Sequence, residues 1–367
     1  MTHALPDVLR SAGAFLVVLG VLVFVHEFGH YLAARWRGVK VDIFSIGFGR
    51  AVATWTDRAG TVWKLAWLPL GGYVKLHGQE RPEDAAPEVR AAWIPGRTFH
   101  SKGVGSRAII VAAGPIANFL LAIVLFGFLF AIIGQPVTLP VVQAVLPHSA
   151  AATAGLRPGD RIRAVDSVPI GDFQALQKVI EANPGVRITL RIVRDGKTLR
   201  VPVVPQAHML GGKRVGLLGV SGGLRKYRPM PVLAAIGAGF RETWLITEKT
   251  AAGVAQMIDG TRGTKDLGGP LRIAQMSGQV AELGLPSLLS FIAVLSVNIG
   301  LINLFPIPVL DGGHLLFFLF EAIRGRPLPA RAQEYGFRAG LALLAGLFVF
   351  ATWNDLSHLG LFHWLIG

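Results

Sequence analysis

Apolar residues gather into four long, nearly charge-free stretches of the chain. These stretches run from about Ala12 to Leu32, Ala108 to Ile133, Leu288 to Phe305 and Ala339 to Trp353. Because a helix needs about 20 apolar residues to cross a bilayer, the pattern predicts a polytopic α-helical membrane protein with about four transmembrane helices. The fourth stretch is short unless the apolar tail that reaches Ile366 extends it.

The segments between these stretches show other periods. Trp55 to Leu76 alternates apolar and polar residues, which predicts a β-hairpin, and on this pattern alone an ordinary interfacial one. Residues 231–258 are apolar but contain four charged side chains, so they suit an amphipathic helix at the outer surface better than a fifth span. Pro306 to Gly313 interrupts the apolar pattern, and a further helix is predicted over Leu315 to Ile323.

Residues 135–224 show the pattern of a small soluble α+β domain. Their order of elements resembles a bacterial PDZ domain, a fold that binds an extended peptide at a sheet edge. The alternative is a spacer domain without a ligand. The predicted elements are a strand over Val141–Val145, a helix over Ser149–Ala154, a strand over Arg161–Val165, a helix over Phe173–Ala182, and a hairpin of Arg187–Val193 with Thr198–Val204 around Asp195-Gly196.

Composition agrees with a membrane protein. The 367 residues are 52% hydrophobic and 16% charged, whereas soluble domains contain about 25% charged residues. Much of the net charge of +14 is expected to flank the apolar stretches and to meet anionic lipid. No basic segment is interleaved with aromatic residues in a nucleic-acid-binding pattern, so nucleic acid is not an expected partner. Cysteine is absent, so disulfides and thiolate ligands are excluded and a metal must use nitrogen and oxygen.

The distribution of Lys and Arg predicts one topology. Only Arg10 precedes the first apolar stretch, whereas Arg35, Arg37 and Lys40 follow it, which favours a retained anchor over a cleaved signal peptide. Residues 35–107 are then cytoplasmic, and both ends of the chain lie outside. We expect a multi-pass membrane protein whose inserted domain lies on the outer side.

The first apolar stretch contains His26-Glu27-Phe28-Gly29-His30. Two histidines four residues apart share one helix face, and both imidazoles can reach a single zinc ion. Glu27 is near enough to act as a base on water at that metal. Polar groups within a membrane are costly, so a functional site is the preferred interpretation. The alternative is a pair of histidines that hydrogen-bond neighbouring helices.

Zinc catalysis requires a third protein ligand and an open position. The candidate is Asp311, which follows a segment where Pro306 and Pro308 stop a helix and precedes Gly312-Gly313, which would permit an unusual turn. Considered alone, Asp-Gly is an ordinary turn dipeptide. Next to a two-histidine helix that lacks a ligand, metal binding is the better interpretation, and the centre is expected toward the cytoplasmic side of the bilayer.

Three motifs together resemble those of the site-2 protease family of intramembrane zinc metalloproteases, and most closely its bacterial regulator-of-sigma-E protease group. They are His26–His30, Gly114-Pro115-Ile116-Ala117-Asn118, and Asn303 to Gly312. The resemblance implies zinc held by His26, His30 and Asp311, with Glu27 as general base. It also implies substrate-positioning roles, which fall here on Asn303, Asn298, Pro306 and Pro308. Some members have two PDZ domains, and this chain has room for one.

The family resemblance implies a zinc endopeptidase that cleaves single-span membrane proteins, such as an anti-sigma factor after external trimming, and also remnant signal peptides. It also implies that the hairpin of Trp55 to Leu76 is membrane-associated, and that the protein lies in the bacterial inner membrane with its PDZ domain in the periplasm. A metal transporter that uses the same three ligands, or a scaffold that works through its PDZ domain, remains an alternative. The parts predicted are residues 1–34 (first transmembrane helix), 35–107 (cytoplasmic loop and hairpin), 108–134 (second helix), 135–224 (PDZ domain), 225–286 (interfacial segment) and 287–367 (third and fourth helices).

Overall fold

The computed structural model describes residues 4–80, 82, 85–210, 213–261, 263 and 268–358. The chain divides into two compact units. Unit 1 comprises Met1–Leu129 and Ile236–Gly367, and unit 2 comprises Phe130–Ala235. The predicted soluble domain therefore falls within unit 2, which is inserted into the sequence of unit 1.

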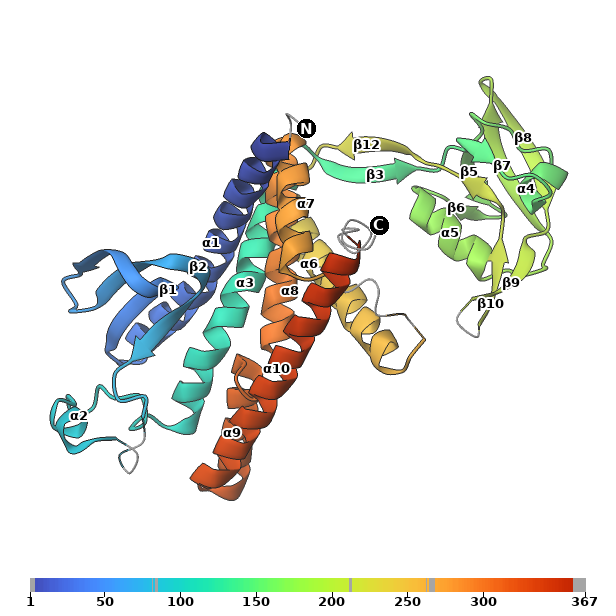
Figure 1. The fold of residues 1–367 in the computed structure, drawn as a ribbon. Coiled ribbons are helices and arrows are strands. Elements are labelled where there is room, and N and C mark those ends of the chain that lie inside the picture. The colour runs from blue at the N-terminus through green and yellow to red at the C-terminus, as the bar shows by residue number, and fades with distance from the viewer. Residues whose placement is uncertain are drawn as a thin grey trace, which may run out of the picture. The chain divides into compact units, whose positions relative to one another are not determined.

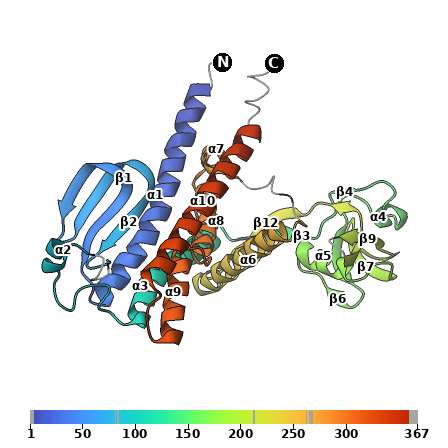
Figure 2. The ribbon, with the colours of Figure 1, turned by 60° about the horizontal axis from the view of Figure 1, so that its bottom comes forward.

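Unit 1 is built on four long apolar helices (Figures 1 and 2). They are α1 (Ala4–Trp36), α3 (Val104–Ile132), α8 (Leu285–Asn303) and α10 (Ala330–His358). Each is long and apolar enough to cross a membrane, and only 6% to 33% of the residues in their most apolar windows are buried inside the molecule. Many of the other side chains in these helices are exposed apolar groups, as expected of surfaces that face lipid. All four predicted apolar stretches are confirmed as helices.

The boundaries of the fourth helix differ from the prediction. Helix α10 begins at Ala330, well before Ala339, because residues 330–334 are good helix formers although two of them are charged. The helix therefore reaches spanning length without the apolar tail, whose residues 359–366 lie outside the described part of the chain.

Two helices occupy the predicted interfacial segment. Helix α6 (Val232–Ile258) agrees in extent with the helix predicted over residues 231–258, whereas α7 (Pro270–Glu282) was not predicted. Both oxygens of the buried Asp355 carboxylate, from α10, accept backbone N–H groups at the start of α7, from Gly269 (2.8 Å) and Arg272 (3.1 Å). This carboxylate satisfies N–H groups that a helix N-terminus leaves free. The remaining helices of unit 1 are α2 (Pro87–Ala91), α6 (Val232–Ile258, whose first residues belong to unit 2), α7 (Pro270–Glu282) and α9 (Asp311–Arg324).

The predicted hairpin is one part of a wider sheet. Strand β1 (Val41–Thr56) pairs with β2 (Val62–Leu76), and both strands bend back on themselves. Residues 41–46 consequently lie between residues 62–65 and residues 72–76. The prediction began at Trp55 because alternation is clear only from there. Among the described strands, none pairs with the outer side of residues 72–76, so this segment is a free edge.

An aspartate at the turn of this sheet holds it to α1. The Asp57 carboxylate accepts hydrogen bonds from Tyr31 Oη (3.0 Å), Trp63 Nε1 (3.1 Å) and the backbone N–H groups of Thr61 and Ala59. Burial opposes ionisation, but these donors outweigh it and lower the pKa of Asp57 to about 2. The clamp is therefore charged at neutral pH and fixes the sheet next to the helix that contains the histidines.

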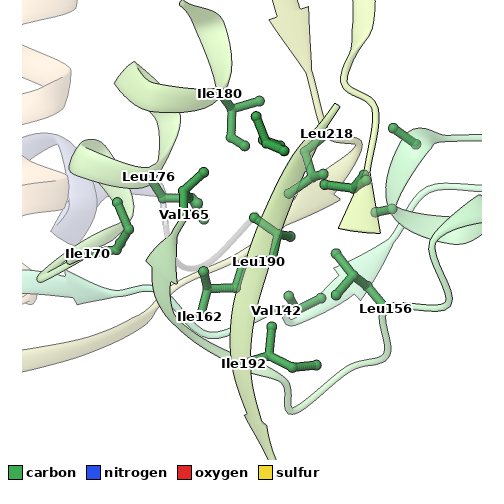
Figure 3. Close-up of a cluster of buried hydrophobic side chains, with 14 residues drawn as sticks. Val142, Leu156, Ile162, Val165, Ile170, Leu176, Ile180, Leu190, Ile192 and Leu218 are labelled. Carbon is green, nitrogen blue, oxygen red and sulfur yellow. The ribbon is translucent and has the colours of Figure 1, made fainter. Parts of the chain in front are cut away.

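Unit 2 has its own hydrophobic core (Figure 3). Fourteen buried side chains form it, and they include Ile162, Leu190 and Ile192 from the sheet and Leu176 and Ile180 from α5. The main sheet has the strand order β6-β5-β7-β8, and three two-stranded ribbons accompany it. The strands are β3 (Gln135–Leu139), β4 (Ala144–Val145), β5 (Arg161–Val165), β6 (Val168–Pro169), β7 (Ile188–Arg194), β8 (Lys197–Val203), β9 (Gln206–Leu210), β10 (Lys213–Leu217), β11 (Val220–Ser221) and β12 (Leu224–Arg228), and the helices are α4 (Ala150–Thr153) and α5 (Phe173–Glu181).

Local sequence explains several boundaries in unit 2. The side chains of Ser149 and Asp172 cap α4 and α5 by accepting N–H groups of the first turn. Asp195 and Gly196 both have positive φ, as a two-residue hairpin turn between β7 and β8 requires. The helix and hairpin predictions are confirmed here to within one or two residues.

The first predicted strand of this unit is wrong in part. Only Ala144–Val145 of the expected Val141–Val145 forms a strand. The N–H of Val142 instead donates to the carbonyl of Asp160, and the Val142 side chain is buried in the core. Local alternation could not reveal this pairing with a loop that follows later in the chain.

Candidate active site

Helix α1 presents three polar side chains on neighbouring positions. The imidazoles of His26 and His30 meet edge to face, with their Nε2 atoms 3.3 Å apart. Four residues make slightly more than one helical turn, so both rings lie on the same side of α1. Glu27 lines the same cavity as the two histidines. The structure therefore brings the predicted motif together on one face.

A short loop delivers the third side chain. Helix α8 ends at Asn303, and α9 begins at Asp311. Between them, Val309 has a φ of 104°, which is unusual for a β-branched residue and marks local backbone strain. The predicted unusual turn is thus at Val309, and Gly312 and Gly313 belong to the first turn of α9 instead.

The two glycines have a packing role. A Cβ at Gly312 would collide with the carbonyl oxygens of Leu304 and Phe305, and a Cβ at Gly313 would collide with that of Ile307. The start of α9 can lie against the loop only because both positions have no side chain. This close approach sets where the Asp311 carboxylate points.

Three potential ligand atoms converge. Asp311 Oδ2 lies 3.1 Å from His26 Nε2 and 3.6 Å from His30 Nε2. Tetrahedral zinc with bonds of 2.0–2.1 Å holds its ligand atoms roughly 3.3–3.4 Å apart, so the three distances suit this metal. Asp311 Oδ2 is also buried and has no hydrogen-bond partner. A buried carboxylate oxygen without a partner is costly, and a metal ion would satisfy it.

Helix α3 forms the wall behind the imidazoles. His30 Nδ1 lies 2.9 Å from the carbonyl oxygen of Ile110, a contact that fixes Nδ1 as the protonated nitrogen and leaves Nε2 free. Asn118 is fully buried, and its Nδ2 lies 3.2 Å from His26 Nδ1. A Cβ at Gly114 would collide with His30 Nε2 and approach His26 Nε2 to 2.9 Å. Gly114 therefore provides the space that both rings occupy.

The site opens into a cavity of about 1060 Å³ within unit 1. On one side, the Val74 backbone lies next to the Glu27 carboxylate, and a Cβ at Gly72 would be 3.1 Å from Glu27 Cγ. On the other side, Arg107 and Glu321 form a half-buried ion pair between α3 and α9, with a shortest distance of 2.6 Å. The free edge of the sheet thus runs directly past the candidate base.

The predicted substrate-positioning residues lie in different places. Asn303 lines the cavity. Pro308 packs against Gly336 and Gly340 of α10, and Pro306 is exposed in the loop. Asn298 accepts a hydrogen bond from the Thr250 hydroxyl of α6, 3.0 Å away. Roles in substrate binding stay predictions for all four residues. Of the four, only Asn303 lines the cavity.

Sequence reasoning missed two features of the site. It named Gly114 only as part of a motif, without a role at the imidazoles, and it did not single out the Arg107–Glu321 pair. A glycine followed by proline within an apolar stretch was the available signal for Gly114, since helix interiors disfavour both residues. No local signal could have predicted that Arg107 pairs with Glu321, because the pair forms only when α3 packs against α9.

Comparison with known proteins agrees with this geometry. The family model described as "Peptidase family M50" matches residues 14–347, which is most of the chain. The chain belongs to peptidase family M50. Members of this site-2 protease family depend on zinc, and the chain is therefore a zinc metalloprotease with helices suited to an integral membrane protein.

Individual relatives of this M50 chain support the assignment. A protein of Rhizobium meliloti (strain 1021) that is named as a zinc metalloprotease is 45% identical over 100% of both chains. The regulator of sigma-E protease RseP of Escherichia coli (strain K12) is 34% identical, and the match covers 96% of this chain and 99% of that protein. That alignment has 456 positions against the 367 residues here, so the relative contains additional segments.

A solved PDZ domain, from the SdrC-like protein of Listeria monocytogenes, covers 22% of this M50 chain and 84% of its own chain. Its sequence identity is 19% and its TM-score is 0.20.

Proposed function

We propose that this M50 protease cleaves single-span membrane proteins within or near the bilayer, with zinc held by His26, His30 and Asp311. The observation that supports this best is the convergence of three ligand atoms around Asp311 Oδ2, which is buried without a hydrogen-bond partner. The site lies on α1, a helix of spanning length, and it opens into a cavity large enough for a peptide segment.

In the proposed mechanism Glu27 is the general base. It takes a proton from the attacking water and later passes it to the leaving amine, so one water is consumed for each peptide bond broken. Zinc, when bound, supplies Lewis acidity that polarises the scissile carbonyl and acidifies nearby water. The Ile110 carbonyl accepts from His30 Nδ1 and holds that imidazole in orientation, and the Asn118 amide contacts His26 Nδ1. Zinc binding by His26 Nε2 requires a protonated Nδ1, so the Asn118 amide would present its oxygen to that ring.

The substrate is proposed to bind as an extended strand. Residues 72–76 form a free sheet edge beside Glu27, and a peptide can add to such an edge through main-chain hydrogen bonds. A substrate helix must unwind to do so, which also exposes the scissile carbonyl that a helix would shield. Asn303 lines the cavity and is the best placed of the four predicted positioning residues to contact the substrate backbone.

The orientation follows from the positive-inside rule. Residues 35–107 are proposed to lie in the cytoplasm, so that the active site opens toward that side. The inserted domain, predicted over 135–224, is then periplasmic in the inner membrane of a bacterium. Its order of elements supports a PDZ-like domain that excludes bulky, untrimmed substrates. Anti-sigma factors and remnant signal peptides are proposed as substrates, in line with the sigma-E regulators among the relatives.

Deleting residues 136–222 tests the proposed exclusion. The shortened protease is expected to cleave an untrimmed single-span substrate that the parent leaves intact, because the bulky external part no longer meets an obstacle. The ratio of cleavage rates for untrimmed and trimmed substrate, in detergent, measures the effect. An unchanged ratio in a variant that still cleaves the trimmed substrate would disprove the sizing role.

Metal removal tests the proposed function itself. Cleavage of a tagged single-span substrate in detergent is expected to stop when a chelator strips zinc and to return when zinc is restored, because the metal completes the centre. Metal flux in reconstituted vesicles without any proteolysis would favour the transporter alternative. Activity that does not depend on zinc would contradict the proposal, and so would active protein without bound metal.

A further inference from the structure

The positive charge of this protein is concentrated in unit 2. Residues 130–235 contain 14 Lys and Arg but only 5 Asp and Glu, a net charge of +9 out of +14 for the chain. We expected much of the net charge to flank the apolar stretches, but only +5 of the +14 lies outside residues 130–235. Most of the net charge therefore lies on a unit that contributes none of the three candidate metal ligands.

Three arginines of this unit share the solvent side of its main sheet. Arg191 of β7 is paired directly opposite Arg200 of β8. Arg163 of β5 is the extra residue of a bulge beside Arg191, between the pairs that Ile162 and Ala164 form with β7. All three side chains are exposed, whereas the neighbouring Ile162 and Ile192 point into the core. The three arginines, here called the arginine row, cross three adjacent strands.

The arginine row has no balancing charge. Among the described residues, no carboxylate forms an ion pair with any of these three guanidinium groups. By contrast, Arg194, on the same strand as Arg191, forms hydrogen bonds of 2.6 and 2.7 Å with the buried Asp160. Burial alone would raise the pKa of Asp160, but the Arg194 guanidinium lowers it, so that pair is ionised at neutral pH. Like charges directly opposite on antiparallel strands destabilise a sheet, so the row adds nothing to the stability of the isolated fold.

We propose that the arginine row is a docking surface for the phosphate groups of anionic phospholipids. Arginine binds phosphate through two parallel hydrogen bonds, and an exposed sheet face offers several such groups at once. Chain connectivity supports lipid as the partner. The ribbon of β3 and β12 has five residues in each strand, about 17 Å, and it leads to α3 and α6 within a few residues. Lys226 and Arg228 in that ribbon are exposed and add two positive charges to the segment that joins the unit to the helices.

Energy transfer to lipid tests this docking in the full-length protein. The chain has no cysteine, so Thr198→Cys on the solvent side of β8 gives a single site for a fluorescent donor. The protein is placed in nanodiscs of phosphatidylcholine, with or without phosphatidylglycerol, that contain an acceptor on the lipid headgroups. Transfer is expected to rise with phosphatidylglycerol and to fall at high salt. The triple variant Arg163→Gln, Arg191→Gln and Arg200→Gln should weaken docking roughly 100-fold, since each cation near an anionic surface contributes about fivefold.

A matched variant separates the arginine row from total charge. The triple variant Lys178→Gln, Lys213→Gln and Arg214→Gln removes the same amount of charge from α5 and β10. Docking should persist in this variant. An equal loss in both triple variants would overturn the assignment to this face. Transfer that does not respond to phosphatidylglycerol, in protein whose thermal unfolding is normal, would overturn the lipid assignment. Row-dependent binding of a labelled polyglutamate peptide without lipid docking would also overturn it, in favour of an acidic polypeptide. None of these outcomes depends on proteolysis.

Discussion

Replacing Glu27 with Gln is expected to lower the rate of substrate cleavage by a factor of about 10² to 10⁴, the usual contribution of a positioned general acid–base group. Gln has nearly the same shape but cannot take a proton from water. Glu27 is not among the three converging ligand residues, so zinc content should not change. Single-turnover cleavage of a tagged single-span protein and elemental analysis of the same preparation measure both quantities.

Glu80 provides a control for this substitution. Its carboxylate also lines the cavity, but it comes from the loop after β2 and not from α1. Glu80→Gln removes the same charge from the same cavity, and its cleavage rate should stay close to that of the parent. If Glu27→Gln retained full activity, another group would have to be the base. If it lost zinc as well as activity, Glu27 would act through the metal centre and not as a base.

Replacing Gly114 with Ala is expected to disrupt the metal centre, although Gly114 is not one of the three candidate ligands. The added methyl group would overlap His30 and press on His26, so at least one ring must move. Loss of one outer-sphere contact typically costs 10-fold to 100-fold in metal affinity, and displacing a ligand should cost at least as much. Zinc affinity in competition with a chelator, and cleavage at saturating zinc, are both expected to fall by about 100-fold or more.

Gly105→Ala is the matched control on the same helix. A Cβ at Gly105 meets nothing within 4 Å, so this variant should bind zinc and cleave substrate as the parent does. Thermal unfolding of both variants distinguishes a damaged site from a damaged fold. Normal zinc affinity in a folded Gly114→Ala protein would show that α3 does not define the space for the imidazoles.

The fold could be predicted from sequence where neighbouring residues decide the structure. Apolar length determined the four helices, and the Asp195-Gly196 turn determined a hairpin. The sheet of β1 and β2 was only half anticipated, because residues 41–46 pair with two separate segments of β2. Pairing between distant segments depends on how strands bend, and alternation along one strand does not contain that information.

The candidate site divides in the same way. Helical periodicity was enough to place His26, Glu27 and His30 on one helix face, because it fixes the directions of their side chains. The sequence also offered Asp311 as the missing ligand on chemical grounds. The folded chain was needed to show that Asp311 Oδ2 lies 3.1 Å from His26 Nε2, that α3 leaves space for the rings at Gly114, and that a sheet edge passes Glu27. The physical reason is that these contacts join distant segments, and their positions follow from close packing between helices, which no local pattern encodes.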